Sequence, residues 1–187
     1  MHYCIHLFTK ELPTKEKIND ILRPFNDESV NYDGLEPAEY PAFTWDYFLI
    51  GGRYGGALKL KIQTDRDDEY QWRFLLRTEN HREGRLFHSS LLSKIRERFI
   101  DYESSEESWF RYMGDGSFIY CDGAKIKDLV DTETLGCYGF VDIDGTAYAR
   151  EQWTGNDFIK HEDFDERYQK TLNERSDCFL TVLDIHD

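Results

Sequence analysis

Long hydrophobic runs are missing from this sequence. No apolar stretch approaches the ~20 residues that a membrane-spanning helix needs. The first residues, Met1-His2-Tyr3-Cys4, carry no basic segment of the kind that opens a secretory signal. The four cysteines show no CxxC spacing, which argues against a zinc ribbon and a thioredoxin-type pair. We therefore expect a cytoplasmic protein with reduced thiols and no membrane partner.

Positive charge is also scarce. Lysine and arginine together number 23 against 37 acidic residues, so the formal net charge is −14. Such a surface repels phosphate backbones, which argues against direct nucleic-acid binding over a wide footprint. It would attract a partner with a basic, nucleic-acid-binding groove, so DNA mimicry is one interpretation. A surface charged only for solubility is the other.

The apolar content is sufficient for one folded domain, because 40% of the 187 residues are hydrophobic and 16% are aromatic. Periodicity and turn residues predict a strand at 2–8, a helix from the N-cap Thr14 to Pro24, a loop at 26–43, a strand at 45–50 paired with 57–62 across the glycines, a strand at 70–76, a helix at 90–100, hairpins at Asp122-Gly123 and Asp144-Gly145, a last helix at 164–172 and a closing strand at 178–186. The fold class that follows is a single α+β domain over residues 1–187. We expect a mainly antiparallel sheet, about three helices on one face, and adjacent first and last strands.

The central segment, residues 44–56, concentrates aromatics and glycines around one carboxylate and one guanidinium. Two glycines after a predicted strand permit a sharp bend that a Cβ would obstruct. In one interpretation an aromatic platform beside an arginine stacks a nucleotide-like ligand and binds its phosphate. In the other, the aromatics belong to the core and the carboxylate pairs with the arginine. The ligand-binding candidates are Trp45, Asp46, Gly51, Gly52, Arg53 and Tyr54.

Metal-binding and catalytic patterns are weak. If the terminal strands pair, His6 could lie near Asp184 or His186, and these are the candidate metal ligands. The alternative is that they are ordinary exposed or partly buried polar residues. No GxSxG nucleophile elbow, Walker loop or dinucleotide fingerprint is present, so no catalytic residue and no cofactor is assigned.

Two segments resemble a group of uncharacterised proteins of bacteriophages and their bacterial hosts. Residues 45–54 are similar to the signature Trp-Asp-Trp-Tyr-x-x-Gly-Gly-Arg-Trp of that group, with Tyr47, Phe48 and Tyr54 replacing Trp, Tyr and Trp. Residues 180–186, Leu-Thr-Val-Leu-Asp-Ile-His, are similar to its closing Leu-Thr-Val-Val-Asp-Cys-His. The resemblance implies a mobile-element setting and carries no established activity.

Two functions follow as expectations. The first is a non-enzymatic, phage-type binding protein that inhibits a host nucleic-acid-binding or defence factor through its acidic surface, as anti-CRISPR and anti-restriction proteins do. The second is a nucleotide-like ligand-binding protein or metal-assisted hydrolase that uses Trp45, Asp46 and Arg53. A structural or assembly role is the remaining option.

Overall fold

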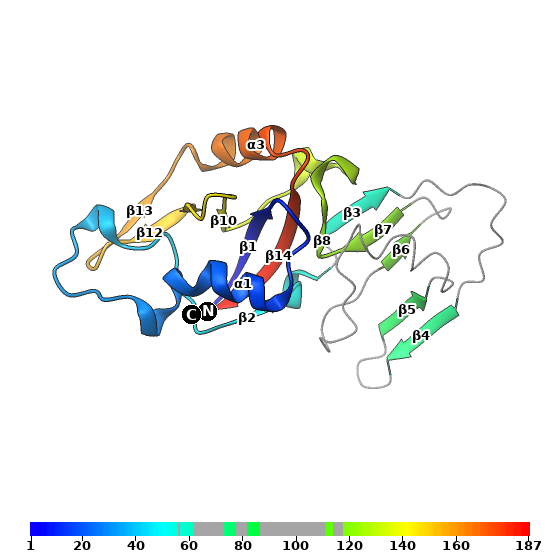
Figure 1. Cartoon of the computed structure of the whole chain (residues 1–187), viewed down its shortest axis with the longest axis horizontal. Helices are drawn as coiled ribbons and strands as arrows, with labels where there is room; N and C mark the ends of the chain where they lie inside the picture. The colour runs from blue at the N-terminus through cyan, green and yellow to red at the C-terminus, as the bar shows by residue number, and fades with distance from the viewer. Residues whose placement is uncertain (56, 62–72, 78–81, 87–110, 114–117) are drawn as a thin grey trace.

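A computed structural model of the chain describes residues 1–55, 57–61, 73–77, 82–86, 111–113 and 118–187. Its centre is a six-stranded sheet in which the first and last strands lie side by side (Figure 1). Strand β1, His2–Thr9, pairs antiparallel with β14, Phe179–His186, over its whole length. The predicted adjacency of the terminal strands is therefore confirmed.

Strand β14 is flanked on its other side by two short strands placed end to end. Strand β8, Gly123–Lys125, pairs with the first part of β14, and β2, Tyr47–Ile50, pairs with the last part. Beyond β1 the sheet continues with β10, Gly139–Val141, which is parallel to β1, and β11, Ala147–Ala149. The mainly antiparallel sheet of the predicted α+β class is thus observed.

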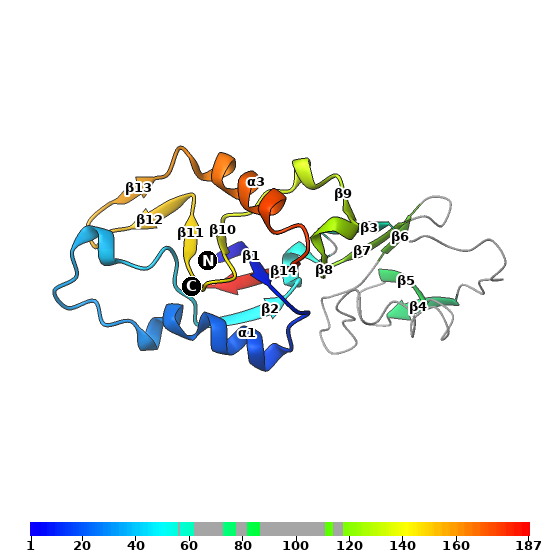
Figure 2. The same ribbon diagram turned by 45° about the horizontal axis from the view of Figure 1, so that its top comes forward.

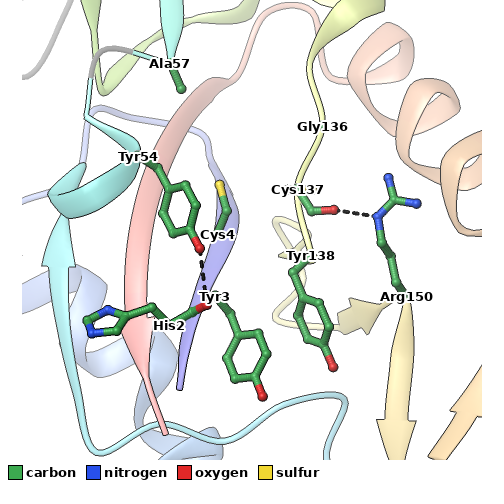
Figure 3. Close-up of a pocket in the computed structure, with 9 residues that line it drawn as sticks. All are labelled: His2, Tyr3, Cys4, Tyr54, Ala57, Gly136, Cys137, Tyr138 and Arg150. Carbon is green, nitrogen blue, oxygen red and sulfur yellow. Dashed lines mark hydrogen bonds between the residues drawn. The ribbon is translucent and has the colours of Figure 1, made fainter.

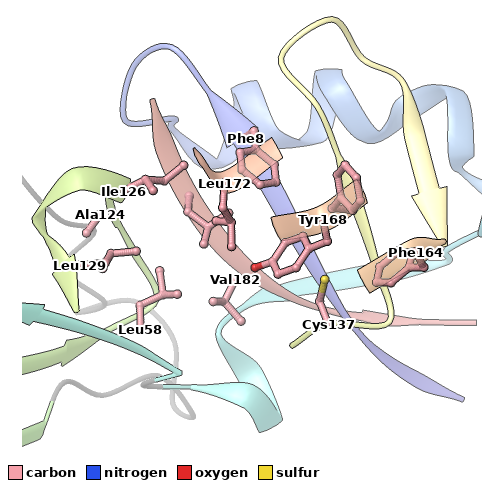
Figure 4. Close-up of a cluster of buried hydrophobic side chains, with 12 residues drawn as sticks. Phe8, Leu58, Ala124, Ile126, Leu129, Cys137, Phe164, Tyr168, Leu172 and Val182 are labelled. Carbon is pink, nitrogen blue, oxygen red and sulfur yellow. The ribbon is translucent and has the colours of Figure 1, made fainter. Parts of the chain in front are cut away.

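The two helices among the described residues cover opposite faces of this sheet (Figure 2). Helix α1, Lys15–Leu22, begins after the N-cap Thr14 and contributes Ile18 and Leu22 to one core cluster. Helix α3, Phe164–Glu174, contributes Phe164, Tyr168 and Leu172 to the other (Figure 4). The prediction of helices on one face is wrong, because consecutive residues of β1 and β14 are buried, so both faces of these strands are covered.

The remaining strands form smaller sheets. A four-stranded sheet has the order β6-β7-β3-β9, and two hairpins pair β4 with β5 and β12 with β13. Their bounds are β3 Leu58–Lys61, β4 Arg73–Arg77, β5 Arg82–Leu86, β6 Arg111–Met113, β7 Phe118–Cys121, β9 Leu129–Val130, β12 Glu151–Trp153 and β13 Phe158–Lys160. The described residues also contain six 3₁₀ turns, namely η1 Arg23–Phe25, η2 Asp27–Ser29, η3 Pro37–Glu39, η4 Gly52–Tyr54, η5 Ile126–Asp128 and η6 Thr132–Thr134.

Two predicted pairings are wrong, and both concern the centre of the chain. Strand β3 pairs with β7 and β9 instead of returning on β2. The Asp122-Gly123 dipeptide is no hairpin turn, since β7 joins the four-stranded sheet while β8 joins β14. By contrast the hairpin at Asp144-Gly145 is confirmed, with Gly145 at a φ of +86° in its turn.

The predicted helix at 90–100 lies outside the described residues, and so do the charged segments at 65–69 and 103–107. The strand predicted at 70–76 is described only as β4. Within the ranges that are described, no helix has the length and apolar character needed to cross a membrane.

Candidate functional site

The diglycine of the central segment lies at the junction where β2 ends and β8 begins along the edge of β14. The Gly51 amide donates to the Val182 carbonyl over 2.9 Å, and the Val182 amide donates to the Asp122 carbonyl. Gly51 has a φ of +71°, and a Cβ there would lie 2.3 Å from Oδ2 of Asp122, whose side chain is fully buried. Glycine is therefore required at this junction both by its backbone conformation and by the carboxylate that packs against it.

Gly52 likewise leaves room for a second buried carboxylate, that of Asp184. With a φ of +49°, it lies so close to Asp184 that a Cβ would approach the Asp184 Cβ to 2.5 Å. The tight turn also directs the Arg53 amide at Asp184 Oδ2, over 2.9 Å. Asp184 is 1% exposed, so the diglycine turn packs over this carboxylate, holds it in place and keeps water from it.

Two histidine–carboxylate pairs extend from this point to the end of the sheet. His2 Nδ1 donates to Asp184 Oδ1 over 2.8 Å, and His186 Nδ1 lies 3.0 Å from Asp46 Oδ1. The strand register explains the grouping, because His2 is directly opposite His186 and their ring centroids are 4.9 Å apart. The Tyr47 ring stacks on His186 at 4.9 Å with an interplanar angle of 15°. We call His2, Asp46, Asp184 and His186 the histidine cluster.

Both imidazoles of the cluster present their second nitrogen away from the carboxylates. A carboxylate only accepts, so each Nδ1 carries a proton and each Nε2 is left as the basic nitrogen of a neutral ring. In the part of the chain that the structure describes, neither Nε2 has a hydrogen-bond partner. The His2 and His186 side chains are 18% and 33% exposed, which leaves them accessible to a ligand.

The electrostatics of the cluster follow from these hydrogen bonds. Desolvation acts to raise the pKa of the Asp46 carboxyl, but hydrogen bonds from His186 and from the Tyr47 amide outweigh it and lower that pKa. Asp46 is therefore ionised at neutral pH and stabilises a proton on its histidine.

Arg53 follows the diglycine in the same turn. Its backbone is tied to Asp184, and its exposed guanidinium has no hydrogen-bond or ion-pair partner among the described residues. Tyr54 fixes the turn from the other side, because its hydroxyl donates to the His2 carbonyl over 3.1 Å. The expected Asp46–Arg53 pair is not formed, since Asp46 binds His186.

Trp45 is set apart from the other candidates of its segment. Its side chain is 6% exposed in the α1 core, and its Nε1 donates to the Leu22 carbonyl over 2.8 Å. The indole thus satisfies a carbonyl at the end of α1 and offers no open face to a ligand. Of the predicted ligand-binding residues, the structure gathers Asp46, Gly51, Gly52, Arg53 and Tyr54 around the cluster and leaves Trp45 in the core.

The three candidate metal ligands do not converge. His6 is opposite Val182 in the strand register, whereas His186 is opposite His2. Four residues separate Val182 from His186, a distance of ~13 Å along a strand. His6 is fully buried, and its Nδ1 contacts the Tyr168 hydroxyl at 2.5 Å. Both Asp184 oxygens already accept hydrogen bonds. Among the described residues there is no group of three or more histidine, cysteine or acidic side chains that could hold a metal.

A cavity of about 540 Å³ borders the cluster, lined by residues of β1, η4 and the segment before β10 (Figure 3). The His2 ring points away from it, and only the His2 backbone faces it. Burial raises the pKa of the Cys4 thiol to about 12 and that of Cys137 well above its usual value, so both thiols are protonated. Arg150 donates to the Cys137 carbonyl and binds Asp165. Neither thiol is therefore a thiolate nucleophile at neutral pH.

Sequence reasoning did not name His2 as a site residue, nor Tyr47, whose ring stacks on His186 of the cluster. A signal for His2 existed, because strand alternation places it with Cys4 and His6 on one face of the first strand. Only the register with β14 shows that His2, and not His6, meets Asp184 and His186.

Comparisons of the chain with models of known protein families, with curated proteins and with solved structures find no match.

Proposed function

We propose that the histidine cluster binds a phosphate-bearing ligand of the nucleotide class and acts on its phosphate ester by general acid–base catalysis. The observation that carries the proposal is the pair of imidazoles 4.9 Å apart, each held at Nδ1 by a carboxylate and each open at Nε2. A carboxylate-oriented histidine is a recurrent proton-transfer device, because the carboxylate fixes the tautomer and stabilises the imidazolium.

The chemistry assigns complementary roles to the two rings. A neutral imidazole accepts a proton from the attacking hydroxyl or water at its Nε2, while a protonated one donates a proton from its Nε2 to the leaving oxygen. Asp184 and Asp46 keep His2 and His186 oriented throughout through their contacts at Nδ1. Positioned acid–base groups of this kind typically contribute 10²–10⁴-fold to a rate.

The ligand class follows from the charges around the rings. A phosphate would be met by the exposed Arg53 guanidinium and by whichever imidazole is protonated, and guanidinium groups recognise phosphate by bidentate hydrogen bonds. Tyr47, 44% exposed and stacked on His186, provides an aromatic surface for a base.

The test uses bis(4-nitrophenyl) phosphate and a panel of nucleotides between pH 5 and pH 8. We expect 4-nitrophenol release with a bell-shaped pH profile, and a rate lowered about 10²-fold or more by His186→Gln. The matched control is His161→Gln, which changes an exposed histidine on the β13 side of the molecule and is expected to leave the rate unchanged.

Equal rates for His186→Gln and the unchanged protein would refute the acid–base role. Thermal-shift measurements separate binding from catalysis, since a ligand at 100-fold its Kd stabilises the folded state by ~2.7 kcal/mol. Absence of any nucleotide or phosphate shift would refute the ligand assignment as well.

A second candidate function is inhibition of a host nucleic-acid-binding or defence factor by a phage-type acidic protein acting in the host cytoplasm. The specific observation in its favour is a run without positive charge, since no lysine or arginine occurs between Arg23 and Arg53. The acidic side chains in this run are all exposed, namely Asp27, Glu28, Asp33, Glu36, Glu39 and Asp46. Such a surface is complementary to a basic groove.

This second candidate predicts association with a purified basic effector complex that weakens steeply as salt increases. A charge-reduced variant, Glu36→Gln with Glu39→Gln, should bind more weakly than a variant that removes two acids of α3. Salt-insensitive association, or no association, would contradict it.

A further inference from the structure

A second, smaller pocket lies on the other face of the sheet edge and is built almost entirely from aromatic rings. Seven of its eleven lining residues are aromatic, and none is lysine, arginine or histidine. Its volume is about 140 Å³, well below the ~300 Å³ of a pocket for a drug-sized molecule. We call it the aromatic pocket, and its aromatic residues are Tyr3, Tyr32, Tyr40, Phe43, Tyr138, Trp153 and Phe158.

Three ring pairs form the walls. Tyr3 in β1 and Tyr138, directly before β10, have centroids 4.4 Å apart. Trp153 and Phe158, opposite each other in the β12–β13 hairpin, are 5.1 Å apart. Tyr32 packs against Tyr40 at 5.9 Å. The faces of these rings carry the negative part of the aromatic quadrupole, which attracts cations.

The walls are held in place before any ligand arrives. The Tyr138 hydroxyl donates to the Glu151 carbonyl over 3.0 Å, and Gln152 donates to the Tyr40 carbonyl. Gly155, in the hairpin turn, lies so close to the Tyr40 hydroxyl that a Cβ would be 2.3 Å from it. The hairpin is therefore docked on the segment that carries Tyr40, and little ordering is left for a ligand to induce.

Carboxylates surround the pocket. Asp187 lines it and accepts a hydrogen bond from Thr44 through Oδ1, and Oδ2 has no hydrogen bond in the described part of the chain. Asp27 accepts from the Tyr32 hydroxyl over 2.9 Å. The Met1 amino group donates to a main-chain oxygen of Asp187 and not to its side-chain carboxylate. Desolvation raises the pKa of Tyr32 to about 12, and the hydrogen bond to Asp27 and the charges of Asp27 and Asp187 act in the same direction.

We propose that the aromatic pocket binds the guanidinium of one arginine side chain from a basic partner protein. An arginine fits better than a lysine, because its planar head stacks on aromatic faces and is more weakly hydrated than an ammonium. The segment between Arg23 and Arg53, which contains acidic residues but no lysine or arginine, supplies Tyr32 and Tyr40 to the pocket. The charge around the pocket therefore also favours binding of a basic segment of the partner. Three large apolar side chains at its rim are exposed, namely Tyr32, Trp153 and Phe158 at 37%, 43% and 55%. An exposed aromatic patch of this kind is typical of a contact surface.

This inference does not depend on the chemistry of the histidine cluster. It adds a specific binding pocket to the proposed acidic-surface inhibitor of a host factor, and a separate measurement tests it.

The test follows the indole N–H signal of Trp153 by ¹H–¹⁵N NMR, assigned with Trp153→Phe. The probes are N-acetyl-arginine N-methylamide and its citrulline counterpart, which has nearly the same shape without the charge, at constant ionic strength. We expect a saturable shift with the arginine probe and about 5-fold or weaker binding of the citrulline probe, because a cation–π contact contributes ~1 kcal/mol or more. The lysine counterpart should bind more weakly than the arginine probe.

Matched variants locate the site. Phe158→Ala should weaken arginine binding about 3-fold or more, while Ile159→Ala, the neighbouring exposed residue at 48%, does not line the pocket and should leave it unchanged. Asp187→Asn, at an exposed position that does not threaten folding, should also weaken it. Equal binding of the arginine and citrulline probes, tighter binding of the lysine probe, or equal effects of Phe158→Ala and Ile159→Ala would each overturn the proposal. A spectrum unchanged by every probe would do the same.

Discussion

His6 should make the stability of this protein fall sharply between pH 7 and pH 5. The side chain extends from β1, contacts Tyr168 of α3 and is fully buried, and this burial lowers its pKa to about 3. Its Nδ1 contacts the Tyr168 hydroxyl, and its Nε2 has no hydrogen-bond partner among the described residues. A proton on this ring would be an uncompensated buried charge, so the folded state keeps it neutral.

The sign and size follow from proton linkage. The unfolded chain binds a proton at its histidine near pH 6.5, whereas the folded state resists it down to about pH 3. Unfolding therefore takes up a proton as the pH falls below 6.5, and the free energy of unfolding decreases. Integrating between pH 7 and pH 5 gives a loss of about 2 kcal/mol from this residue alone. The figure hardly changes for any folded-state pKa below about 4, because the ring stays neutral at pH 5 in every such case.

The assay is urea-induced unfolding at pH 7, 6 and 5 for the unchanged protein, for His6→Gln and for the exposed control His161→Gln. The three proteins have the same carboxylates, so the difference between their plots of unfolding free energy against pH gives the contribution of the substituted histidine. We expect His6→Gln to lose about 2 kcal/mol less than the unchanged protein over this interval, and His161→Gln to follow the unchanged protein. Parallel pH dependences for all three would refute the neutral, buried state of His6.

Two further predictions concern the central segment. Gly52→Ala should destabilise the fold by at least ~2 kcal/mol more than Gly34→Ala in urea unfolding. Both glycines have positive φ, but a Cβ at Gly52 would lie 2.5 Å from Asp184, whereas Gly34 has open space around it. Equal effects would contradict the close packing of Gly52 on Asp184. Trp45→Phe should cost about 2 kcal/mol or more of unfolding free energy, since it leaves the Leu22 carbonyl without its indole donor and loses buried ring area; a change within ~0.5 kcal/mol would show that the indole hydrogen bond contributes little.

Local patterns in the sequence were sufficient for the elements whose signals are strong and self-contained. The strands at 2–8 and 178–186, the N-cap at Thr14 and the Asp144-Gly145 turn each depend on a few neighbouring residues, and all four appear in the structure. The Asp122-Gly123 signal is equally strong, yet tertiary pairing overrides it, since β8 completes the edge of β14 and β7 pairs with β3.

The sequence by itself determined that Gly51 and Gly52 mark a special backbone and that Asp184 and His186 end a strand. It could not determine what those glycines accommodate, because the two buried carboxylates come from positions 71 and 132 residues further along the chain. It also could not choose between His2 and His6, since a strand register is a property of two distant segments packed together. Tertiary structure decided the cluster by aligning His2 with His186, and it decided the aromatic pocket by docking a hairpin on a loop more than a hundred residues away.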